Sequence, residues 1–469
     1  MQRPPVSFEL PPSSETLAPP IPPLPRLKWV WVLFTILFVS LISGSLFTND
    51  LKKSPAKELE AQQDKAIEMQ LCLKSVMPTG NADANSQMFE QQIDDLLDAS
   101  KTDPKAQKLR IVLRLEDKQK PFMDDVKNLA KSKRAEDQAF AKLFAEPKPK
   151  KEEAMALLKK IDGNELSERL AAVQVKESFG DKDIRSKVFN PQKVAGISIF
   201  IILGVCGFGI GTILWIYYYL QRQTGRLAPK GLPMSDIDWG RADRLLFVSV
   251  LMIMTYLGSG EILGLLFPKS SGNIEVFAYL PIFLVMGICL RVPIFGWRIT
   301  PEKVGLSFKD FPQKLGWAFA AFFANIPVMF AILLVTSALL RFLPGGSHPV
   351  SEELMNNPKA PELIKIFFLA CVIAPIWEEF FFRGLLFPAF TKAFKNPIYG
   401  ALLSSFIFAA IHPQGAAGIL SLMGVALMLC FVSYQTKSLV SNIILHGLHN
   451  GATLAFALVA APILNTLIR

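Results

Sequence analysis

The chain has little cysteine and histidine: its 469 residues include five cysteines and four histidines. Four of the cysteines lie in apolar runs and no two form a CxxC pair, which excludes a disulfide framework and a CxxC metal site. The HExxH pattern of zinc proteases is also missing.

A nucleic-acid partner is not predicted, although the net charge is +10. Residues 49–190 hold 27 basic and 26 acidic residues, so the basic excess lies in the short loops between apolar runs, as the positive-inside rule predicts.

Long apolar runs are abundant in the chain. Apolar residues make up 51% of the sequence and the mean hydropathy is +0.33. Runs of about 18 apolar residues are long enough to cross a bilayer as helices. We therefore expect an all-α protein, a polytopic membrane bundle of about nine spans with a soluble all-α domain inserted after the first span. The expected spans are Trp29–Phe47, Val194–Leu220, Leu245–Phe267, Glu275–Gly296, Leu315–Leu343, Leu363–Phe387, Ile398–Ile411, Gly415–Tyr434 and Ile443–Leu467.

Composition divides the chain into five parts. Residues 1–28 are proline-rich and predict a disordered tail. Residues 29–48 predict a signal anchor, since their apolar core is longer than that of a cleaved signal peptide. Residues 49–190 are polar, and in several short pieces apolar residues recur at helical spacing. This predicts a soluble helical domain that binds an unknown partner or acts as a spacer. Residues 194–343 predict accessory membrane helices, and residues 362–467 a membrane core.

The distribution of basic residues predicts the orientation. We set residues 49–190 aside and assume a cytoplasmic N-terminus. The segments on the cytoplasmic side then hold 17 Lys and Arg, and the segments on the other side hold 6. Positive residues favour the cytoplasmic side. We therefore expect a multi-pass protein of the plasma or inner membrane, with a cytoplasmic N-terminus and an extracytoplasmic helical domain.

Two carboxylates lie in the apolar run APIWEEFFFRG. Ionisable residues inside membrane spans are costly and indicate a functional site. Glu379 and Arg383 are four residues apart, so they share a helix face and are expected to pair. Glu378 points about 100° away and has no such partner. This separation predicts Glu378 as a general base and Glu379 as a structural anchor.

Histidines follow in two further apolar runs. Phe408 and His412 share a helix face, as do His446 and Asn450, whereas His449 lies on a neighbouring face. Such residues can orient a water molecule, bind a metal or stabilise an oxyanion. A further carboxylate, Glu261, lies beside a GxxxG pair, where a functional role and a polar contact at a tight helix crossing are both open.

The three patterns together resemble the CAAX protease and bacteriocin-processing family of intramembrane proteases. They read Glu378-Glu379-Phe-Phe-Phe-Arg383, Phe408-Ala-Ala-Ile-His412 and His446-Gly-Leu-His-Asn450. The resemblance covers roughly residues 362–462. It implies an all-α membrane fold and hydrolysis of a peptide bond in a membrane-associated substrate, either a CAAX-type lipidated protein or a peptide under maturation.

The resemblance also implies roles for these residues. Glu378 would activate the water that His412 shares, and His446 with Asn450 would support the oxyanion. Glu379, Arg383 and Phe408 would support the site. Two readings of the cofactor stay open: Glu378, His412 and His446 as ligands of a divalent metal such as zinc, or a glutamate mechanism without a metal.

Two other classes of protein also place charges in membrane spans. One is a non-catalytic scaffold or immunity factor whose helical domain binds a partner, and the other is a proton-coupled transporter.

The depths of Glu378 and His412 in the membrane matter for the protease, because both must reach the same water molecule. Counted along their helices, Glu378 and His412 differ in depth by about 9 Å, which a tilted helix would have to close.

Overall fold

The structure of the chain is a computed structural model. It describes residues 24–52, 103–116, 120–121, 123–161, 165–181, 184, 191–234, 237–266, 277, 279–339, 360–412 and 415–459. The proline-rich residues 1–23, residues 53–102 of the predicted helical domain and the end of the last predicted span lie outside the described residues.

The predicted all-α membrane fold is confirmed. Among the residues that the structure describes, six helices are long and apolar enough to span a membrane, and three shorter apolar helices accompany them. A count of nine full spans is therefore not confirmed. Within the described ranges the only extended pairing is an isolated bridge between Ile294 and Trp297. The helices of the bundle are α1 (Trp29–Lys52), α10 (Pro191–Gln223), α11 (Trp239–Leu266), α13 (Leu280–Arg291), α14 (Phe311–Leu339), α19 (Pro397–Ala410), α20 (Gly415–Thr436), α21 (Leu439–Val459) and a composite helix over Ala360–Phe394.

The composite helix contains two π-helical segments. It runs through α16 (Ala360–Phe368), the π-helix η1 (Leu369–Ile373), α17 (Ala374–Glu379), the π-helix η2 (Phe380–Leu386) and α18 (Phe387–Phe394). The two glutamates therefore end a short α-helical piece between two π-helical segments. Such segments are rare and are found frequently at functional sites.

The first helix, α1, is part of the bundle core. Phe34 stacks on Phe38 at 4.3 Å between ring centroids, and Phe38 in turn lies 6.1 Å from Phe381 of η2. At the start of α1, the buried carboxylate of Asp243 on α11 accepts hydrogen bonds from the side chains of Arg26 and Trp31 at 2.8 Å. Helix α1 is therefore tied to the helices that surround the two glutamates.

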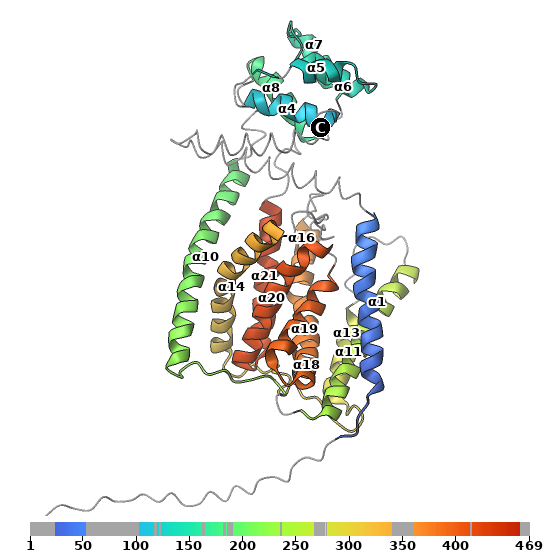
Figure 1. Cartoon of the computed structure of the whole chain (residues 1–469), viewed down its shortest axis with the longest axis vertical. Coiled ribbons are helices and arrows are strands. Elements are labelled where there is room, and N and C mark those ends of the chain that lie inside the picture. The colour runs from blue at the N-terminus through green and yellow to red at the C-terminus, as the bar shows by residue number, and fades with distance from the viewer. Residues whose placement is uncertain are drawn as a thin grey trace, which may run out of the picture.

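The helical domain lies at one end of the bundle (Figure 1). Its described helices are α4 (Pro104–Glu116), α5 (Met123–Ala130), α6 (Ala135–Leu143), α7 (Lys151–Leu158) and α8 (Leu166–Ser178). They share an apolar core, and the ammonium of Lys108 is buried among three carboxylates. Burial alone would lower the pKa of Lys108, but hydrogen bonds to Glu168 and Asp137 raise it above its usual range. The lysine therefore stays charged and joins α4, α6 and the start of α8.

Candidate active site

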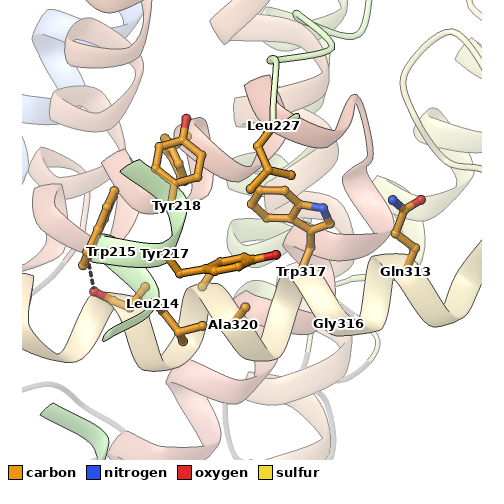
Figure 2. A pocket seen from close by; sticks show the side chains of 12 residues that line it. Leu214, Trp215, Tyr217, Tyr218, Leu227, Gln313, Gly316, Trp317 and Ala320 are labelled. Carbon is orange, nitrogen blue, oxygen red and sulfur yellow. Dashed lines mark hydrogen bonds between the residues drawn. The ribbon is translucent and has the colours of Figure 1, made fainter. Parts of the chain in front are cut away.

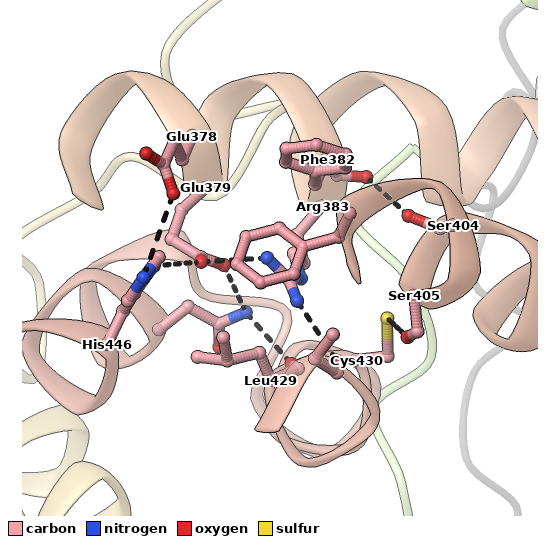
Figure 3. Close-up of polar contacts among 12 residues, drawn as sticks. Glu378, Glu379, Phe382, Arg383, Ser404, Ser405, Leu429, Cys430 and His446 are labelled. Carbon is pink, nitrogen blue, oxygen red and sulfur yellow. Dashed lines mark hydrogen bonds and ion pairs between the residues drawn. The ribbon is translucent and has the colours of Figure 1, made fainter. Parts of the chain in front are cut away.

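The carboxylate of Glu379 is the centre of a buried polar cluster (Figure 3). Its Oε1 accepts hydrogen bonds from Arg383 at 2.9 Å and from Nδ1 of His446 at 2.8 Å, and its Oε2 accepts one from Asn442 at 3.3 Å. The side chains of Glu379 and Arg383 are fully buried. A buried charge is tolerated when it is paired and hydrogen-bonded, and Glu379 has both kinds of partner. The ion pair expected from the spacing of Glu379 and Arg383 is present.

The orientation of His446 follows from Glu379. An ionised carboxylate only accepts hydrogen bonds, so Nδ1 of His446 carries the donated proton. The other nitrogen, Nε2, then faces Oε2 of Glu378 at 3.7 Å. That distance is too long for a direct hydrogen bond between the two side chains as they stand. Glu378 is 14% exposed, whereas Glu379 is fully buried, so the adjacent carboxylates have different environments.

Phe408 lies between the two histidines. Its ring centroid is 4.3 Å from that of His412 and 5.8 Å from that of His446. The guanidinium carbon of Arg383 lies 4.9 Å from the centroid of the same ring, within the range of a cation–π contact. Nδ1 of His412 donates to the carbonyl of Phe408, and the imidazole lies within electrostatic range of Glu378 and His446.

The lengths of the two helices bear on the depth difference counted from the sequence. The helix of Glu378 has 35 residues, about 52 Å at the α-helical rise, whereas the hydrocarbon core is about 30 Å thick. A helix this long must tilt or extend beyond the core. The helix of His412, α19, has only 14 residues, about 21 Å, and His412 follows its end.

Asn450 has a structural partner in the π-helix η1. Pro375 has no N–H, and with α-helical bonding it would leave the carbonyl of Cys371 free. The π-helix shifts the position of the free carbonyl by one residue, because the N–H of Ala374 bonds to the carbonyl of Leu369, five residues back. The carbonyl of Ala370 then loses its donor at Pro375, and the amide of Asn450 replaces that donor at 2.7 Å.

Two residues singled out in the sequence lie elsewhere. His449 points toward α14, where its Nε2 is 3.0 Å from the amide nitrogen of the buried Asn325. Glu261 is exposed near the end of α11, and nothing lies within 4 Å of a side chain added at Gly260. The described residues therefore show no tight helix crossing at Gly260.

Asn442 is a member of the cluster that the sequence analysis missed. Besides its bond to Glu379, its amide donates to the carbonyl of Leu429 on α20 at 2.9 Å. The spacing held a signal, since Asn442, His446 and Asn450 follow one another at intervals of four and share one face of α21.

Zinc in proteins is typically held by three or four His, Cys, Asp or Glu side chains. Within the parts of the chain that the structure describes, no three His, Cys, Asp or Glu side chains form a metal-binding group. Nδ1 of His446 is hydrogen-bonded to Glu379, and Nδ1 of His412 is hydrogen-bonded to the Phe408 carbonyl.

Comparison with known proteins points to one family. Residues 360–452 match the family model described as type II CAAX prenyl endopeptidase Rce1-like. This range includes Glu378, Glu379, Arg383, His412, His446 and Asn450. No solved structure matches the chain.

Three curated bacterial proteins are similar to part of the chain. The membrane-embedded CAAX protease MroQ of Staphylococcus aureus (strain USA300) is 28% identical over 232 residues, which cover 45% of this chain and 90% of that protein. The uncharacterized protein YyaK of Bacillus subtilis (strain 168) is 29% identical over 142 residues, 30% of this chain and 42% of its own length. The UPF0177 protein YbdI of Lactococcus lactis subsp. lactis (strain IL1403) is 28% identical over 122 residues, which cover 26% of this chain and 65% of that protein.

Gly447 is predicted to be essential for the contact between α21 and η1. A Cβ atom at Gly447 would lie 2.4 Å from the carbonyl oxygen of Cys371, whereas one at Gly451 would lie an ordinary 3.6 Å from the Cys371 sulfur. Gly447→Ala should therefore push α21 away from η1 and lower the thermal unfolding temperature. Gly451→Ala is the matched control, and it should keep or raise that temperature because alanine favours helix by about 1 kcal/mol. Equal effects of the two variants would contradict the close contact.

Proposed function

We propose that this multi-pass membrane protein, whose residues 360–452 belong to the type II CAAX prenyl endopeptidase Rce1-like family, hydrolyses a peptide bond in a membrane-associated substrate. The substrate is a lipidated protein of the CAAX type or a peptide under maturation. Glu378 is the general base, and the protein carries out the reaction with its own side chains.

The geometry supports Glu378 as the group that activates water. It is partly exposed, it is separate from the Glu379–Arg383 pair, and it faces Nε2 of His446 across 3.7 Å. A water molecule there would donate one proton to the Glu378 carboxylate as its oxygen attacks the scissile carbonyl. If the Nδ1 of His412 donates to the Phe408 carbonyl, its Nε2 is left to accept the second proton of that water in a hydrogen bond.

The developing oxyanion needs hydrogen-bond donors at fixed positions. His446 is held by Glu379, and in its protonated form its Nε2–H would donate to the oxyanion. Asn450 has two N–H groups, of which one is bonded to Ala370, so the other would serve as a second donor. Collapse of the intermediate breaks the C–N bond, and Glu378 returns its proton to the leaving amine.

One observation supports this assignment above the others: Glu379 accepts from Nδ1 of His446 while Glu378 faces Nε2 of the same ring. Glu379 thus orients the imidazole of His446, and Glu378 faces the ring nitrogen that Glu379 leaves open. A scaffold would have no need of two carboxylates directed at one imidazole.

Glu378→Gln and His412→Ala should stop cleavage without unfolding the protein. Loss of a general base typically lowers a rate by about 10²–10⁴-fold. Comparative proteomics of the membrane fraction should then show substrates that are shortened by the wild type and intact in both variants. Glu261→Gln is a control, because its carboxylate is exposed and takes no part in the hydrogen bonds of the polar cluster.

Three outcomes of the same experiment would count against the proposal. An unchanged set of peptides in Glu378→Gln would favour a scaffold, and flux that responds to pH would favour a transporter. Loss of cleavage after exhaustive chelation, together with a stoichiometric zinc that His412→Ala removes, would replace the glutamate mechanism by a metal mechanism.

The orientation of the protein is a second proposal. The basic residues at the end of the bundle opposite the helical domain indicate that this end is cytoplasmic. A cysteine introduced at the exposed Lys133 should react with an impermeant maleimide in intact cells, after replacement of Cys72. A cysteine at the exposed Lys395 should react only after the cells are opened, and the reverse pattern would contradict the orientation.

A further inference from the structure

A cavity of about 330 Å³ lies between α10 and α14, apart from the polar cluster (Figure 2). It is lined by the last turns of α10, the first turns of α14 and Phe431 of α20. Figure 2 shows Tyr217 of α10 and Trp317 of α14 beside the same space. Its volume is at the lower end of the range found for small-molecule sites, about 300–1,000 Å³.

The polar atoms of two aromatic residues in the wall are already occupied within the protein. Nε1 of Trp215 donates to the carbonyl of Ala324 at 2.7 Å, and the hydroxyl of Tyr218 accepts from the side chain of Gln435 at 2.6 Å. These rings therefore present carbon surface to the cavity. An aliphatic chain suits such a wall, whereas a polar ligand would lose its hydrogen bonds to water without replacement.

Cations surround the same end of the two helices. Arg222 follows Tyr218 by four residues on α10, and its charge acts on the Tyr218 hydroxyl. Lys230 lies in the next loop, where its N–H bonds to the carbonyl of Gln435 at 3.4 Å. Lys314 follows Gln313, which lines the cavity, and it lies within electrostatic range of Lys230.

The balance of charge at this rim is positive. Asp310 is the acidic residue that acts on Lys314, and it offsets one of the three cations. Tryptophan and tyrosine are enriched where membrane spans meet the headgroups. Basic pockets between spans at the cytoplasmic surface bind the headgroups of anionic lipids. The apolar cavity and the cationic rim together match an amphiphile with one chain and an anionic head.

We propose that this cavity, referred to as the α10–α14 cavity, binds an anionic phospholipid of the bilayer. One acyl chain fills the cavity, and the phosphate lies against Arg222, Lys230 and Lys314. A zwitterionic lipid would fill the cavity equally well but would carry no net charge to the rim. The proposal goes beyond the proteolytic function and does not depend on it.

Native mass spectrometry of the purified full chain tests the proposal directly. The protein is exchanged into detergent that contains equal amounts of phosphatidylglycerol and phosphatidylcholine. The wild type should retain one phosphatidylglycerol in preference to phosphatidylcholine. A phosphatidylglycerol with a photoreactive acyl chain should label peptides of α10 and α14, and it should do so equally in the Glu378→Gln variant. The lipid site and the proteolytic function can therefore fail separately.

Variants of the wall and the rim give the quantitative test. Ala320→Phe fills the cavity and should lower retention at least about tenfold, whereas Ala331→Phe, at an exposed position of the same helix, should not. Each substitution among Arg222→Gln, Lys230→Gln and Lys314→Gln should lower retention about fivefold, since a basic residue near an anionic lipid contributes about 1 kcal/mol. Glutamine at the exposed Arg298, Lys303 and Lys395 is the charge-matched control.

Defined results would overturn the proposal. Equal retention of the two lipids, or wild-type retention by Ala320→Phe with an unchanged unfolding temperature, would show that the cavity does not hold an anionic lipid. Label that maps to other helices would place the lipid elsewhere. Displacement of the lipid by a farnesylated peptide would assign the cavity to a lipidated substrate instead.

Discussion

The arrangement of the whole site depends on the buried carboxylate of Glu379. It joins Arg383 and His446 directly, and Asn442 and Arg383 extend the network to carbonyls of α20 at Leu429 and Ala426. Removing one partner of a buried ion pair typically costs about 3–5 kcal/mol, because the other charge remains buried and unpaired. The pair thus constrains three helices to one relative position. The orientation of the His446 ring, and with it the nitrogen that faces Glu378, is a consequence of that constraint.

The π-helical segments explain how the remaining groups reach the same place. η1 shifts a free carbonyl to Ala370, where Asn450 fills the missing bond, and the absence of a side chain at Gly447 lets α21 approach Cys371. Arg383 lies in η2 and still reaches Glu379 across one turn. Winding irregularities in a helix expose backbone groups that side chains of other helices can bind. The composite helix is thereby held to α21 at η1, before the two glutamates, and to α20 through Arg383 after them.

Much of this could be predicted from the sequence, for reasons of spacing. The Glu379–Arg383 pair follows from a separation of four, and the all-α membrane fold from the length of the apolar runs. The role of Glu379 as the partner of His446 could not be predicted, since it depends on the packing of α21 against α17. Asn442 was missed because a neutral amide in an apolar run gives a weaker signal than a charge. The position of His412 depended on helix tilt, and Asn450 on a π-helix that no local sequence rule predicts.

The central claim is that Glu379 fixes the site and Glu378 performs the chemistry. Thermal unfolding of the purified protein, measured beside cleavage, separates the two roles in Glu379→Gln and Glu378→Gln. Glu379→Gln should lower the unfolding temperature by several degrees and lose cleavage as a consequence, because Arg383 and His446 lose their anionic partner. Glu378→Gln should lose cleavage at an unfolding temperature close to that of the wild type. A large loss of stability in Glu378→Gln, or none in Glu379→Gln, would contradict the account.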